Sequence, residues 1–126
     1  MSVLACGLAT VDVVQTVQRV PSTDEKVVAL ATRVEAGGPA LNAALTSAWL
    51  GMPCRLITAV GHSPLAAVVM ADCAEFGVDL VDVAGEGFEL PVASVLVTQA
   101  TGERAVVSVG ALGLESGTVA VPDDVD

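Results

Sequence analysis

The segment "EAGGPALNAALTSAWLG", residues 35–51, decides the fold prediction, because two glycines and a proline stand directly before an alanine-rich run. The apolar residues of that run recur at the spacing of one helical face, at positions 41, 44, 45, 48 and 49. Gly51 and Pro53 end the pattern. The segment therefore predicts a helix that begins near Pro39 and shows one face to a core.

The same residues are candidates for a binding loop. Gly37 and Gly38 would let the backbone take positive φ or approach a ligand closely. The helix start would offer N–H groups, and Asn42 an amide that both donates and accepts hydrogen bonds. Such a loop suits a neutral polyhydroxylated ligand or a phosphate, but neither GK[ST] nor GxGxxG is present. A tight strand-to-helix turn with an ordinary cap explains the residues equally well.

The regions on either side predict a parallel α/β core. Short apolar runs at residues 3–6, 54–60 and 78–83 are typical of buried strands. Between the last two runs, Ser63 and Pro64 are an expected helix start and Gly77 its end. The buried stripe of this second helix is expected to consist of Leu65, Val69, Cys73 and Phe76. Strand, helix, strand, helix, strand indicates a right-handed parallel sheet.

Two further β-rich segments are predicted to be insertions into this core. Residues 11–34 contain two extended stretches around "PSTDE", and residues 92–109 contain two stretches around "QATGE", which is typical of a hairpin. After Gly110 the sequence is turn-rich and acidic, without a clear period. Three parallel strands would leave a long open edge, so the fold is expected to be only part of a larger one.

Composition excludes several classes of function. The formal charge of −10 and the 2% aromatic content argue against nucleic acid or anionic lipid as a partner. No apolar run is long enough for a membrane span, and the start lacks a basic n-region, so a soluble cytoplasmic protein is expected. The three cysteines are expected to be buried and reduced, and with His62 as the only histidine no zinc site is expected.

Two charged residues are further candidates for ligand binding. Asp12 follows Gly7 at the expected end of the first strand, where ligands of open α/β sheets bind. Its carboxylate could accept hydrogen bonds from sugar hydroxyls, and a solvated turn residue is the alternative. Arg104 lies just past the expected hairpin turn, where a surface charge is the simplest interpretation.

Taken together, these stretches resemble the N-terminal part of the ribokinase-like (PfkB) carbohydrate kinases. The resemblance runs from about residue 2 to residue 110 and rests on "GLATVDVV", the glycine-pair stretch, "AVGHSPLAAVVMADCAEFGVDLVDV" and "ATGERAVV". It implies a ribokinase-like three-layer α/β fold, with residues 1–126 as the N-terminal portion of the kinase domain. Segments 11–34 and 92–109 would be the β lid. The ketohexokinase branch is the most similar one.

The resemblance also implies roles for individual residues. Asp12 matches the aspartate that binds substrate hydroxyls, and Gly37, Gly38 and Asn42 match the glycine pair and asparagine of the sugar site. Arg104 is similar in position to a hairpin arginine that approaches the sugar. ATP and Mg²⁺ are implied as cosubstrate and cofactor, and a homodimer through the lid as the assembly.

The sequence departs from the family pattern in two places. Ser63 and Ala66 stand where family members usually carry an aspartate and a glycine. The family's late Gly-Ala-Gly-Asp, which supplies the catalytic base, and its Asn-x-x-x-Glu segment do not occur. The chain is therefore expected to supply the sugar-binding and lid portion of a sugar kinase and to be inactive alone. A nucleoside kinase, or a non-catalytic sugar-binding module, is the alternative.

Overall fold

The computed structural model describes residues 1–110, and the turn-rich tail considered above lies outside the described residues. Three parallel strands form a core sheet in the order β1-β4-β5. They are β1 (Val3–Cys6), β4 (Cys54–Thr58) and β5 (Asp79–Asp82). The parallel α/β core predicted from the sequence is confirmed.

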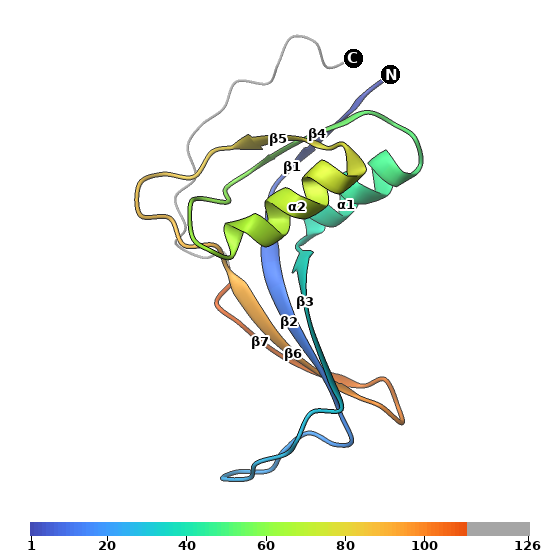
Figure 1. Ribbon diagram of the computed structural model, residues 1–126, viewed down its shortest axis with the longest axis vertical. Helices are drawn as coiled ribbons and strands as arrows, with labels where there is room; N and C mark the ends of the chain where they lie inside the picture. Colours follow the sequence, from blue (N-terminus) through green and yellow to red (C-terminus); the bar gives the residue numbers. More distant parts are fainter. Residues whose placement is uncertain (111–126) are drawn as a thin grey trace.

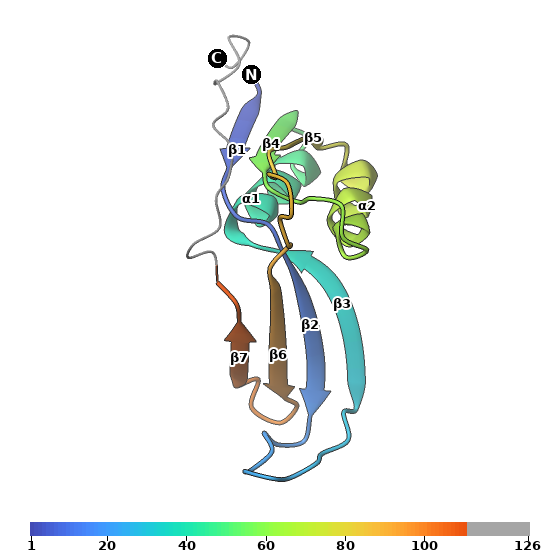
Figure 2. The ribbon, with the colours of Figure 1, turned by 90° about the vertical axis from the view of Figure 1, so that its left-hand side faces the viewer.

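Two helices, α1 (Pro39–Trp49) and α2 (Ala66–Phe76), pack on one face of this core sheet (Figure 2). The strands turn alternate residues toward them, so that Ala5 and Leu56 are buried beneath the helices. Leu41 of α1 and Val69 of α2 are completely buried against this layer. Burying a side chain of this size contributes roughly 1.5–3 kcal/mol to folding, so this layer holds the core together.

A second, outer sheet of four strands projects from one end of the core (Figure 1). Its order is β3-β2-β6-β7, and its strands are β2 (Thr10–Val17), β3 (Ala31–Gly37), β6 (Val92–Thr98) and β7 (Arg104–Ser108). The two outer pairs are antiparallel, whereas the central pair, β2 with β6, is parallel. The two β-rich insertions thus form one sheet.

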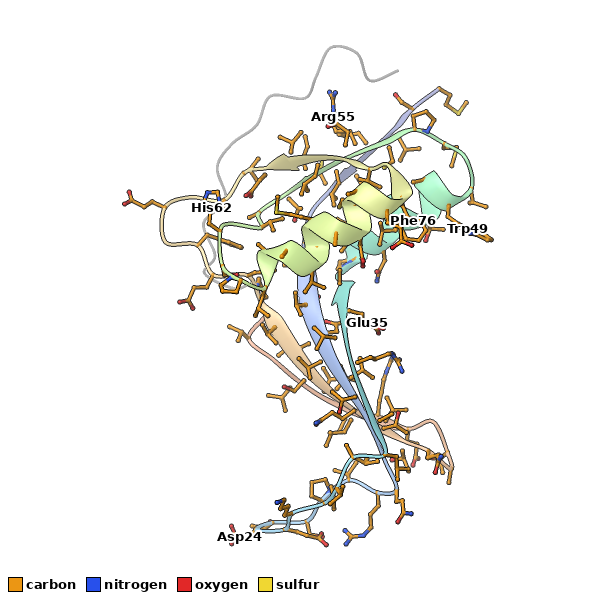
Figure 3. All side chains as sticks on the ribbon, in the orientation of Figure 1. Asp24, Glu35, Trp49, Arg55, His62 and Phe76 are labelled. Carbon is orange, nitrogen blue, oxygen red and sulfur yellow. The ribbon has the colours of Figure 1, made fainter. Side chains whose placement is uncertain are left out.

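The helix ends differ from the sequence prediction. Helix α2 begins at Ala66, because residues 63–65 form a turn in which the Ala66 N–H donates to the Ser63 carbonyl at 2.9 Å. Ser63 therefore does not cap the helix, and its buried hydroxyl has no partner among the described residues. Phe76 and Trp49, expected in the buried stripes, are 40% and 74% exposed (Figure 3). Leu65 is also exposed, because it lies in the turn before α2, whose buried residues are Ala66, Val69 and Cys73.

The cysteines do not all share one environment. Cys54 and Cys73 are buried, and burial raises the pKa of both thiols. Cys6 is exposed, so the prediction of three buried thiols is wrong at this position. The reason is its place at the end of β1, on the sheet face opposite to the helices. Between residues 1 and 110, no helix has the length and apolar character needed to cross a bilayer.

The loop between β2 and β3 is held by an ion pair between Arg19 and Glu25. The Ser22 N–H also donates to the Glu25 carboxylate at 2.9 Å. The Arg19 guanidinium, followed by this amide, lowers the pKa of Glu25 to about 2. The Arg19–Glu25 ion pair is therefore expected to be lost when Glu25 is protonated.

Candidate functional site

Gly38 connects β3 of the outer sheet to helix α1, and its backbone touches the connection between β1 and β2. Gly38 has φ 98° and ψ 147°, and a Cβ there would lie 2.5 Å from the Leu8 carbonyl oxygen and 2.9 Å from the Ala9 Cα. The Ala40 N–H donates to the same Leu8 carbonyl at 3.3 Å. Glycine is required here because the backbone of the β1–β2 connection fills the space of a side chain.

Asp12 lies beside this crossing, near the start of β2. A Cβ at Gly37 would lie 2.4 Å from Asp12 Oδ2, so the Asp12 carboxylate occupies the space left by the missing side chain. The Thr10 hydroxyl donates to Asp12 Oδ1 at 3.0 Å and fixes the orientation of the carboxylate. Asp12 is partly exposed, so part of its hydrogen-bonding capacity faces outward. Such a carboxylate can accept hydrogen bonds from ligand hydroxyls.

Asn42 lies in the first turn of α1, where its backbone N–H donates to the Gly38 carbonyl at 2.9 Å. Its side chain is exposed and makes no hydrogen bond to another residue of the described part. The expected row of free N–H groups at this helix start is not present. Pro39 has no N–H, and the Ala40 N–H is taken by Leu8. This start therefore offers less to an anion than predicted and suits a neutral ligand better.

Arg104 is not brought to this group. It pairs with Val97, whereas Asp12 pairs with Ala93 of the same strand. Four residues along a strand correspond to about 13 Å. The structure thus brings Asp12, Gly37 and Gly38 into contact, places Asn42 one helical turn further on, and leaves Arg104 at a distance on the outer sheet.

Two acidic residues that the sequence analysis did not single out also lie near strand ends, Glu35 in β3 and Asp82 in β5. Glu35 of β3 is the direct cross-strand partner of Asp12. The Asp82 carboxylate, at the end of β5, accepts three backbone hydrogen bonds of 2.8, 3.0 and 2.9 Å from the amides of residues 60, 61 and 84. Asp82 thereby holds the loop that follows β4. Its signal in the sequence was its position as the last polar residue of "VDLVD".

His62, the single histidine, is exposed in the loop after β4. Across residues 1–110, no three His, Cys, Asp or Glu side chains gather in a way that could hold a metal ion. The described residues therefore do not fit a Mg²⁺ site.

The comparisons with known proteins agree with this geometry. The family model for the pfkB family carbohydrate kinases matches residues 1–120. Among solved structures, a candidate ribokinase from Agrobacterium tumefaciens is 25% identical with a TM-score of 0.75, over 85% of this chain and 35% of that one. A ribokinase from Arabidopsis thaliana complexed with ribose and ATP is 20% identical with a TM-score of 0.64, over 86% and 35%.

An archaeal nucleoside kinase from Methanocaldococcus jannaschii has the same fold, at 18% identity and a TM-score of 0.68, over 85% of this chain and 36% of that one. The chain thus spans about a third of the length of the structures it matches. The matched region includes both sheets and the whole glycine-pair site. With a family model that matches nearly all of its length, the chain belongs to the pfkB family of carbohydrate kinases.

Proposed function

We propose that this chain is the sugar-binding and lid portion of an ATP-dependent sugar kinase that phosphorylates a hydroxymethyl group of a ketose or pentose. The observation that carries the proposal is the placement of Asp12. Its carboxylate lies over Gly37 and is oriented by the Thr10 hydroxyl, and the exposed Asn42 follows Gly38 in the first turn of α1. A hydrogen-bond acceptor beside a group that both donates and accepts is what a sugar diol requires.

In this proposal each residue has a limited task. Asp12 accepts hydrogen bonds from sugar hydroxyls, and Asn42 binds a neighbouring hydroxyl. Gly37 leaves the space that the Asp12 carboxylate occupies, and Gly38 lets the start of α1 pack against the β1–β2 connection, so both hold the sugar-binding groups in place. The outer sheet is the lid that excludes water from the site, since water would compete for the phosphoryl group. Arg104 is proposed to contact a part of the sugar remote from Asp12, because it lies on the same outer sheet about 13 Å further along the strand direction.

ATP is proposed as the phosphoryl donor, with Mg²⁺ as its partner. The Arabidopsis ribokinase is complexed with ribose and ATP, which supports this choice. We infer that both bind to parts of the protein outside residues 1–110, since in that range no three His, Cys, Asp or Glu side chains gather to hold a metal ion. Phosphoryl transfer depends on positioning and charge stabilisation. Residues 1–126 alone are therefore expected to bind sugar without turning over ATP.

We also propose that, within the family, the protein belongs to the ketohexokinase branch. A cytoplasmic location and a homodimer through the outer sheet follow the family pattern, and the exposed Val106 and Val107 of β7 would support such contacts. The nucleoside kinase of Methanocaldococcus jannaschii shares the fold, so a nucleoside is the alternative substrate.

The proposal is tested by isothermal titration of the full-length protein with ribose, fructose and adenosine, followed by an ATP-coupled assay with the ligand that binds. Asp12→Ala and Asn42→Ala are expected to weaken sugar binding at least tenfold and to leave ATP affinity nearly unchanged. Tenfold corresponds to about 1.4 kcal/mol, the upper part of the range of about 0.5–1.5 kcal/mol for a typical hydrogen bond. Equal losses for sugar and ATP would contradict the assigned roles. Binding of sugar without any turnover by the full-length protein would favour a non-catalytic sugar-binding module.

A further inference from the structure

Two carboxylates stand side by side at the proposed sugar site. Asp12 of β2 and Glu35 of β3 are direct cross-strand partners. Their sequence neighbours Val11 and Ala36, also partners of each other, belong to the buried core or pack against it. Since side chains alternate along a strand, Asp12 and Glu35 both project from the opposite, open face of the outer sheet. Glu35 is visible on β3 just below the helices in Figure 3.

This pairing is unfavourable for the sheet itself. Directly opposite residues have Cβ atoms about 4.5–5.5 Å apart, and like charges in that arrangement destabilise a sheet. Arg33 Nε donates to Glu35 Oε2 at 2.9 Å and holds Glu35 in place, but both side chains are about half exposed. The ion pair with Arg33 therefore offsets part of the repulsion between Glu35 and Asp12.

Among the described residues, no lysine or arginine places an unpaired positive charge beside Asp12. The sequence has five lysines and arginines, and three of them form ion pairs: Arg19, Arg33 and Arg55. Lys26 lies in the β2–β3 loop, beyond the end of the strands, and Arg104 lies four residues along from the row of Asp12. Arg33 offsets the charge of Glu35, so Asp12, Glu35 and Arg33 together leave one net negative charge at this place on the sheet.

We propose that Glu35 is a specificity-determining residue, which makes the site select uncharged sugars and reject phosphorylated ones. The inference rests on the proposed function and deepens it. Two adjacent carboxylates accept hydrogen bonds from neighbouring hydroxyls, whereas a sugar phosphate must bring a further negative charge toward them. Arg33 acts as the residue that positions Glu35 through its ion pair.

The test compares matched ligands on the full-length protein. Calorimetric titration with ribose and ribose 5-phosphate, and with fructose and fructose 6-phosphate, gives the ratio of the two dissociation constants for each pair. Glu35→Gln removes the charge and keeps an oxygen for Arg33. Glu75→Gln, on the exposed surface of α2, removes the same charge away from the outer sheet and is the control.

Wild-type protein is expected to prefer the uncharged sugar. Glu35→Gln is expected to reduce that preference about threefold to fiftyfold, the range for like charges about 7 Å apart between the dielectric constant of water and that near a protein surface. The control variant should leave the ratio unchanged. The preference should also shrink as NaCl is raised to 1 M, where the screening length falls to about 3 Å. If Glu35 acts through its charge, the salt dependence should be weaker in Glu35→Gln than in wild type, whereas a merely structural role would leave the two equal.

The outcomes separate the two proposals. If the protein binds both members of a pair equally, or Glu35→Gln leaves the ratio unchanged, the role of Glu35 is refuted while the sugar kinase proposal stands. A wild-type preference for the phosphorylated sugar also refutes it, and would assign a phosphate subsite instead. If neither kind of sugar binds and none is phosphorylated, the proposed function itself fails.

Discussion

Replacing Gly38 by alanine should strongly destabilise the fold, and the structure gives the size of the effect. The backbone at this position has φ 98° and ψ 147°, a conformation that other residues adopt at a cost of about 1–3 kcal/mol. The added Cβ would also meet the Leu8 carbonyl oxygen at 2.5 Å and the Ala9 Cα at 2.9 Å. These are backbone atoms, so they cannot rotate away, and overpacking of this kind costs a further 1–3 kcal/mol or so.

The expected loss is therefore about 2–6 kcal/mol of the 5–15 kcal/mol typical of a folded domain. Gly37→Ala is the matched comparison at the neighbouring position. Gly37 does not have a positive φ, and its added Cβ would meet the Asp12 carboxylate, which can rotate at a cost of about 0.5–1.5 kcal/mol. We expect this variant to keep the fold and to lose sugar affinity, because Asp12 is displaced.

Urea unfolding followed by far-ultraviolet circular dichroism measures both free energies of unfolding. Trp49 is too exposed to be a good fluorescence probe. The reasoning is refuted if Gly38→Ala unfolds within 0.5 kcal/mol of wild type, since most surface changes fall within that range. It is also refuted if Gly37→Ala is the more destabilising of the two.

Three other properties can be checked directly. Iodoacetamide should label Cys6 rapidly in the native protein, whereas Cys54 and Cys73 should react only after unfolding, as peptide mass spectrometry would show. Asp82→Ala should lower the free energy of unfolding in urea by about 1–3 kcal/mol, because three backbone amides lose their acceptor. Asp82→Asn should cost less, because it keeps an oxygen. Equal losses would argue against a role of the carboxylate in holding the loop after β4. The pKa of Glu25 in the folded protein, about 2, is below its ordinary value of 4.5. The stability that Glu25 contributes is therefore complete above pH 4.5 and is lost as the pH falls toward 2. An NMR titration of Glu25 with a midpoint near 4.5 would contradict the ion pair.

The order of helices and strands could be predicted from the sequence because each element carries a local signal. The apolar spacing of residues 41–49 and the glycines at both ends predicted α1 within a residue of its observed bounds. The parallel pairing of β2 with β6 could not be predicted in this way, because it joins segments with no shared local pattern. The exposure of Trp49 and Phe76 was missed for a related reason, since periodicity identifies a face but not how far a partner extends beneath it.

Most residues of the candidate site could likewise be predicted from the sequence, whereas their contacts could not. Asp12, Gly37, Gly38 and Asn42 were identified from the glycine pair, the strand end and the family resemblance. Their contacts required the structure, which gives Gly37 and Gly38 packing roles against Asp12 and Leu8. Glu35 was overlooked because its significance comes from cross-strand register.

The parallel pairing of β2 with β6 also has a consequence for how the molecule folds. Val11 pairs with Val92, so both helices and two core strands lie between these partners in the chain. Closing such a long segment carries an entropic cost that must be met before the contact forms, and chains dominated by distant contacts fold slowly. We therefore expect the hairpin of β6 and β7 to join β2 only after the core has collapsed. During synthesis, β2 would emerge from the ribosome long before β6, so one edge of β2 would stay unpaired until β6 has been made.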